Sequence, residues 1–156
     1  MKFPELNDSL VITARKINDI NTIKSKIESQ LHTMKAKSIV TDNLITFSIL
    51  KFYMPSGSLK DRNDSLKIIK EGTIVISKEG KSLKISWSVK LDSLYFLALC
   101  CSGVAGLAAS LYLSTELVFS LSIGIAFFLM FVFLGILFIK YKLSDLIESS
   151  VYPNYN

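Results

Sequence analysis

Few side chains of this chain have the type and spacing that metal binding, catalysis or ligand binding needs. The one histidine, His32, has no second histidine to join it, and the two cysteines, Cys100 and Cys101, are adjacent within a long apolar stretch. Structural and catalytic zinc sites need three or four such ligands, so we predict no metal site. Adjacent cysteines on a helix point in different directions, which argues against a disulfide between them. Asp61 and Asp64 could face a ligand together, but Asp-Arg-Asn-Asp is also an ordinary loop sequence.

Serine and glycine patterns do not indicate catalysis either. The serines are numerous, but none stands in the sharp strand-to-helix turn that exposes a nucleophile. Gly57, Gly72 and Gly80 are isolated turn glycines without the spacing of a phosphate-binding loop. The sequence therefore predicts a non-catalytic protein without a cofactor.

The charges divide the chain into two parts. Residues 1–92 hold 16 of the 18 Lys and Arg residues and 10 of the 13 acidic residues, whereas residues 93–139 hold a single charge, Glu116. Such a change in composition is typical of a soluble domain joined to a lipid-embedded segment. The basic residues stand singly among Ser, Asp and Glu, so we expect a solvated face or contact with anionic headgroups, and no nucleic acid.

Residues 1–90 predict a small cytosolic α+β domain with the order β-α-β-β-β-β. The short β-branched stretch 9–15 predicts the first strand. From Ile20 to Met34, apolar residues recur at spacings of three and four, which predicts an amphipathic helix. The antiparallel sheet is expected to pack its apolar face against this helix.

Two β-hairpins are expected after the helix. Their turns are Asp42-Asn43 and Glu79-Gly80, which tolerate the backbone angles of tight turns. Between the hairpins, residues 53–65 contain Pro, Gly and mixed charges and predict an exposed loop. The expected strands are residues 38–41, 44–52, 66–77 and 81–90, the last of which alternates apolar and polar residues most strictly.

Two long segments without any charge follow the domain. Leu94–Leu113 has 20 residues and Leu117–Ile139 has 23, so as helices they measure about 30 and 35 Å, enough to cross a bilayer. Neither segment has a polar face for water, which argues against two buried helices of a soluble bundle. Only three residues separate the segments, so we predict an antiparallel transmembrane hairpin.

Lysines flank these segments, and the intervening turn has no Lys or Arg. The positive-inside rule then places both termini in the cytoplasm, and we predict a protein of the bacterial inner membrane. The last strand enters the first span almost without a linker, so the basic residues are expected to meet lipid headgroups. This basic set consists of Lys81, Lys84, Lys90, Lys140 and Lys142.

The predicted domains are residues 1–90, the hairpin 91–142 and a short cytosolic tail, 143–156. Within the tail, residues 143–151 are amphipathic and predict a continuation of the second helix along the inner membrane surface.

Small residues repeat along the two predicted spans. They let helix backbones approach closely in lipid, where the hydrophobic effect does not drive helices together. The repeat therefore predicts a helix-packing groove, which either joins the two helices of the hairpin or docks a partner subunit or a second copy. The groove residues are Ala98, Ser102, Gly106 and Ser110 on the first span and Ser120 and Gly124 on the second.

These observations favour a non-catalytic, membrane-anchored interaction or accessory subunit of a larger membrane-associated complex. Its expected partners are the lipid bilayer and, through the membrane helices, a protein partner or a second copy. The alternatives are an oligomeric pore or membrane-permeabilising factor, and a membrane-tethered ligand-sensing or immunity protein. The spans carry no ionisable residue and two helices enclose no channel, which weighs against transport.

Overall fold

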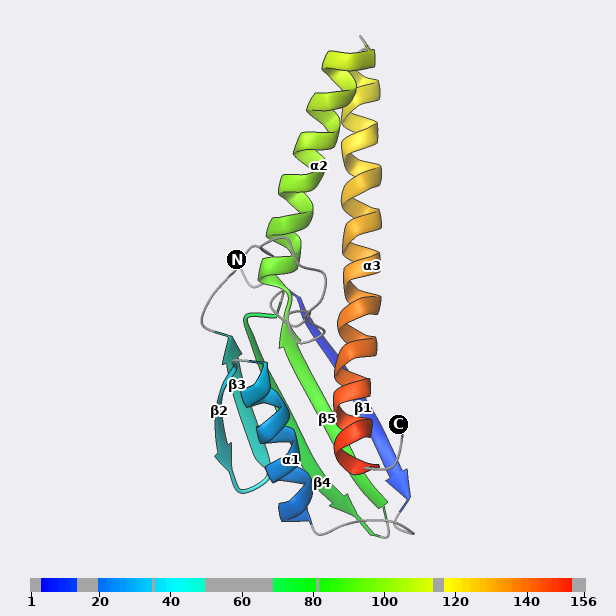
Figure 1. Ribbon diagram of the computed structural model, residues 1–156. Coiled ribbons are helices and arrows are strands. Elements are labelled where there is room, and N and C mark those ends of the chain that lie inside the picture. The colour runs from blue at the N-terminus through cyan, green and yellow to red at the C-terminus, as the bar shows by residue number, and fades with distance from the viewer. Residues whose placement is uncertain are drawn as a thin grey trace. The chain divides into compact units, whose positions relative to one another are not determined.

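The computed structural model describes residues 4–13, 20–34, 36–49, 69–80, 82–113 and 117–152. In this part of the chain the elements follow in the order β-α-β-β-β-β-α-α (Figure 1). The internal contacts divide the chain into two compact units. We call the unit formed by residues 1–91 and 139–156 the sheet domain, and the unit formed by residues 92–138 the helical hairpin.

The described strands of the sheet domain form one antiparallel sheet with the order β1-β5-β4-β3-β2. The first strand lies beside the last, because Glu5 pairs with Lys90 and Thr13 with Ser82. The strands are β1 (Glu5–Thr13), β2 (Ala36–Thr41), β3 (Leu44–Ile49), β4 (Glu71–Glu79) and β5 (Ser82–Lys90).

One face of this sheet is apolar because its strands alternate. In β5, Leu83, Ile85 and the other odd-numbered residues are buried, whereas the Ser and Lys residues between them are half-buried or exposed. In the neighbouring pair of strands, Phe47 lies opposite Gly72, so this glycine lies within β4 and not in a turn as predicted. A Cβ atom at Gly72 would come within 2.7 Å of Phe47 Cε1, so the glycine leaves the space that the buried ring occupies.

The helix α1 (Ile20–Thr33) covers part of the apolar face. Ile23, Ile27 and Leu31 recur every four residues, so they share one side of the helix, and all three are fully buried. The helix lies against β2 and β3. The predicted helix and the α+β class are therefore confirmed.

The remaining helices are α2 (Asp92–Leu113) and α3 (Leu117–Val151). Both are long and apolar enough to cross a membrane. The continuation of α3 beyond Ile139 is confirmed, but its last turns do not offer their apolar side to a membrane surface. Residues 139–151 belong to the sheet domain, where Leu143 and Ile147 are fully buried. Figure 1 shows this end of α3 on the same face of the sheet as α1.

Several predicted strand boundaries differ from the structure. The second strand begins at Ala36 instead of residue 38, and the fourth begins at Glu71 instead of residue 66. The first strand begins at Glu5 instead of Ser9, because nine backbone pairs with β5 outweigh the low strand propensity of Asn7 and Asp8. The fourth strand extends to Glu79 instead of ending at residue 77. The predicted loop 53–65 lies outside the described residues.

Candidate interaction surfaces

The helices α2 and α3 of the hairpin approach each other through small residues. A Cβ atom at Gly106 would lie 3.3 Å from the Ser120 carbonyl oxygen, and one at Gly124 would lie 3.2 Å from the Ser102 carbonyl oxygen. Ser102 and Ser120 are themselves buried in this contact, each about 7% exposed. The backbones come this close because none of these four residues has a bulky side chain.

An open groove runs along one side of the same pair of helices and has a volume of about 550 Å³. Each helix contributes six residues at alternating spacings of three and one, so each wall is one helical face. Ala98, the remaining residue of the predicted groove, is buried and does not line it. The lining residues are Leu99, Ser102, Gly103, Gly106, Leu107 and Ser110 from α2, and Leu117, Ser120, Leu121, Gly124, Ile125 and Phe128 from α3.

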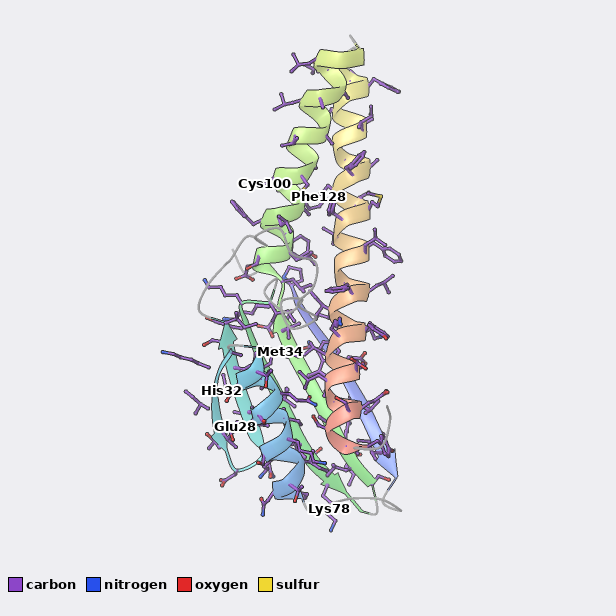
Figure 2. All side chains as sticks on the ribbon, in the orientation of Figure 1. Glu28, His32, Met34, Lys78, Cys100 and Phe128 are labelled. Carbon is purple, nitrogen blue, oxygen red and sulfur yellow. The ribbon has the colours of Figure 1, made fainter. Side chains whose placement is uncertain are left out.

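The hairpin has a second close approach, which the sequence reasoning missed. A Cβ atom at Gly135 would lie 3.0 Å from Leu94 Cδ2, so α3 needs a glycine where the Leu94 side chain packs against it. Nearby, the rings of Tyr95 and Phe128 lie 6.3 Å apart between centroids; Figure 2 labels Phe128 on α3. The available signal for this contact was Gly135 itself, a glycine of the long apolar helix that lies outside the predicted repeat of small residues.

The outer surface of the hairpin is made of large apolar side chains. Val104 and Leu111 on α2 and Leu117, Val118 and Leu129 on α3 are each more than 60% exposed. Such a continuous apolar surface is rare on soluble monomers and marks contact with lipid or with protein.

The sheet domain carries a polar cleft between α1 and the strands β2 and β3, with a volume of about 690 Å³. Glu28 and His32 are four residues apart on α1 and lie on the same side of the helix (Figure 2). Lys37 enters from β2. The remaining lining residues are Ala36, Ser38, Ile39, Thr46, Phe47 and Ser48.

The cleft brings one carboxylate, one imidazole and one ammonium group to the same region, together with several hydroxyl groups. In the described part of the chain, no three His, Cys, Asp or Glu side chains gather as a metal site requires. Charged and hydroxyl groups thus line the cleft together with apolar side chains, among them Ala36 and Ile39. Asp61 and Asp64 lie outside the described residues, so their pairing stays a prediction.

Three lysines of the basic set form ion pairs within the sheet domain. Lys84 pairs with Glu79, Lys90 with Glu71 and Lys140 with Asp8, at 3.4, 2.7 and 3.0 Å between nitrogen and oxygen. These carboxylates offset part of the positive charge of the set. Lys81 lies outside the described residues, and Lys142 is half-buried.

The two shorter ion pairs change the acidity of their carboxyl groups. The hydrogen bond from Lys90 and its positive charge lower the pKa of Glu71. The hydrogen bond from Lys140, followed by one from the Ser9 backbone N–H, lowers the pKa of Asp8. Both carboxyl groups therefore stay charged to lower pH than in an unfolded chain.

Comparison with known proteins assigns no family to the chain, since no family model, curated protein or solved structure matches it.

Proposed function

We propose that the protein is an integral membrane protein and that its helical hairpin crosses the bilayer twice. The observation that carries this proposal is the surface of the hairpin, whose exposed side chains are mostly large and apolar. In water this surface would lead to association, whereas hydrocarbon solvates it at no cost. All backbone hydrogen bonds of a helix are internal, so α2 and α3 are compatible with lipid on every side.

The sheet domain contains chain segments from both sides of the hairpin, and this supports an even number of membrane crossings. Residues before α2 and residues at the end of α3 belong to this one domain, which supports a topology in which both flanks of the hairpin are on the same side of the membrane. The lysines of the basic set flank the apolar segments on that side, and the turn has none. The positive-inside rule then favours a cytoplasmic sheet domain, in a bacterium at the inner membrane.

Within the membrane, the protein acts as a non-catalytic interaction or accessory subunit. The groove of the hairpin supports this role, because its glycines and serines allow a third helix to approach closely. That helix comes from a partner protein or from a second copy of the chain.

Cysteine accessibility tests the topology. Cys100 and Cys101 are replaced by Ala, and single cysteines are introduced as Lys78→Cys, Asp145→Cys and Thr115→Cys. In intact bacterial cells, a membrane-impermeant maleimide should label only the Thr115→Cys variant, and cell lysis should expose the other two. Two results would contradict a hairpin that crosses the membrane twice. One is labelling that places positions 78 and 145 on opposite sides of the membrane, and the other is a protein that stays in the soluble fraction.

Purification in mild detergent, followed by crosslinking in native membranes, tests the role of subunit. We expect a stable complex with another membrane protein or with a second copy. A chain that runs as a monomer without a co-purifying protein under all of these conditions would exclude the subunit role and leave the membrane topology untouched.

The polar cleft of the sheet domain supports a second candidate function, membrane-tethered sensing of a small ligand. Groups of both charge signs and several hydroxyls line the cleft, which suits a small polar molecule that carries charge. A panel of small metabolites tests this candidate by thermal shift. A compound that raises the melting temperature of the wild type but not of Lys37→Ala and Glu28→Gln variants supports sensing, and a panel without such a compound argues against it.

A further inference from the structure

The last turns of α3, residues 139–151, form a helical segment that we call the C-terminal clasp. Five aliphatic side chains of the clasp are at most 3% exposed, although 47 residues of hairpin separate the clasp from the rest of the sheet domain. These side chains are Ile139, Leu143, Leu146, Ile147 and Val151.

Specific polar contacts fix the clasp at both ends. Near its start, Lys140 forms an ion pair with Asp8 of β1. Near its end, the Gln30 amide nitrogen of α1 donates to Ser149 Oγ at 3.1 Å, and Ser150 Oγ donates to Gln30 Oε1 at 3.0 Å. Ser150 is fully buried, and its hydroxyl also lies 2.8 Å from the Leu146 carbonyl oxygen of the clasp itself, so Gln30 adds a contact between α1 and the clasp.

The clasp lies beside α1 on the same face of the sheet, toward the edge that β1 forms (Figure 1). The helix α1 lies against β2 and β3, whereas Asp8 ties the clasp to β1 at the opposite edge of the sheet. The apolar side chains of this half, among them Ile12, Leu83 and Ile85, are buried in the sheet domain. Burial of five aliphatic side chains contributes a free energy comparable with the whole stability of a small domain.

We infer that the clasp is an obligatory part of the sheet domain, so that the domain completes its fold only after the whole hairpin has been made. The strands and α1 are synthesised first, and their apolar face on the β1 side stays open until residues 139–151 dock. Together with the proposed function, this order makes folding of the sheet domain dependent on correct insertion. If only one of the two helices crossed the bilayer, the clasp and the strands would lie on opposite sides of the membrane, and the clasp could not dock.

Hydrogen exchange of the full chain in detergent tests the clasp, with Ile147→Asp as the variant. The buried carboxylate should release the clasp and accelerate exchange in β1 and β5 by at least about a hundredfold, while α2 keeps its protection. Glu148→Lys, an exposed change on the same turn, is the matched control and should exchange like the wild type. Gln30→Ala removes the two hydrogen bonds from α1 and should give an intermediate acceleration.

The clasp inference is wrong if β1 and β5 of the Ile147→Asp variant keep wild-type protection. It is also wrong if α2 loses protection together with the sheet, because the segment would then not act as part of a separate domain. A chain that ends at Phe138 should reproduce the Ile147→Asp result. Because exchange in detergent does not depend on topology, failure of this inference is distinguishable from failure of the proposed membrane function, which maleimide labelling reports.

Discussion

Val11 in the sheet domain and Leu107 in the hairpin expose nearly the same fraction of their side chains, 62% and 66%. Their surroundings differ. Val11 lies opposite Lys84 on a sheet face whose other residues are mostly Ser, Thr and charged groups, whereas Leu107 has exposed Val104 and Leu111 on the neighbouring turns. The exposed fraction alone therefore does not distinguish the two positions, whereas the continuity of the apolar surface around Leu107 does.

The two regions also differ in what holds their elements together. In the sheet domain, α1 and the clasp bury isoleucines and leucines against the strands, and removal of this surface from water stabilises the fold. In the hairpin, the helices meet at glycines and serines, and in the bilayer that we propose close backbone approach would replace the hydrophobic effect. Substitutions of the same kind should consequently have different effects in the two regions.

The largest expected difference comes from placing a charge at the two exposed apolar positions. Leu107→Lys should impair membrane insertion, because a lysine at the centre of a membrane helix costs about 2.5–3.5 kcal/mol. Val11→Lys places a second lysine opposite Lys84, and because like charges across a strand pair repel only mildly, it should lower the free energy of unfolding by at most about 1 kcal/mol. Carbonate extraction of membranes measures the first effect, and hydrogen exchange of β1 in detergent measures the second. Equal behaviour of the two variants in carbonate extraction would contradict a lipid environment for the hairpin.

A smaller difference is expected when a methyl group is added to a glycine in each region. Gly72→Ala forces Phe47 and Val89 to move, since both lie within 3 Å of the new Cβ atom, and should destabilise the sheet domain by about 1–3 kcal/mol. Gly124→Ala meets the Ser102 carbonyl oxygen at 3.2 Å, so the helices need to separate only slightly, and the loss of stability should be smaller than for Gly72→Ala.

Gly103→Ala is the control for this pair, because nothing lies within 4 Å of its added Cβ atom. Hydrogen exchange in detergent reports the sheet domain and the hairpin separately for all three variants. A larger loss of protection for Gly124→Ala than for Gly72→Ala would show that the helix contact is the more tightly packed one.

Local patterns were sufficient to predict most elements of the sheet domain. The alternation of Leu83, Ile85 and Trp87 with polar residues predicted β5, because a strand with one buried face repeats every two residues. The apolar stripe that begins at Ile20 predicted the start of α1, since only a helix brings residues three and four apart onto one side. The beginning of β1 at Glu5 depends on pairing with β5, a contact between distant parts of the chain.

The position of the clasp could not be predicted for the same reason. The sequence indicated that residues 143–151 are amphipathic but not which surface their apolar side meets. The side chains of Gln30 and Ser150 are 120 positions apart, and no local pattern connects them. Similarly, the repeat of small residues does not determine which side of α2 faces α3. It therefore could not predict that Ser102 is buried and Ser110 is exposed.

The smallest expected effect concerns the ion pair between the clasp and the sheet, and it depends on pH. The hydrogen bond from Lys140 holds the pKa of Asp8 below its ordinary value of 3.8. Because the pKa is lower in the folded state, the stabilisation is complete above about pH 4 and is lost as the pH falls through the lowered pKa. Both side chains are partly exposed, so Asp8→Asn should cost only about 0.2–1 kcal/mol at pH 7.

The difference in unfolding free energy between wild type and Asp8→Asn should therefore shrink when the pH is lowered from 7 to 3. Denaturant unfolding in detergent measures it at both values. Glu71→Gln is the matched control, since the pKa of Glu71 is also lowered, but by Lys90 of the neighbouring strand. Its effect should have the same pH dependence, yet only Asp8→Asn should accelerate hydrogen exchange in the clasp. If the difference in unfolding free energy between wild type and Asp8→Asn were as large at pH 3 as at pH 7, the charge of Asp8 would not be what holds the clasp to β1.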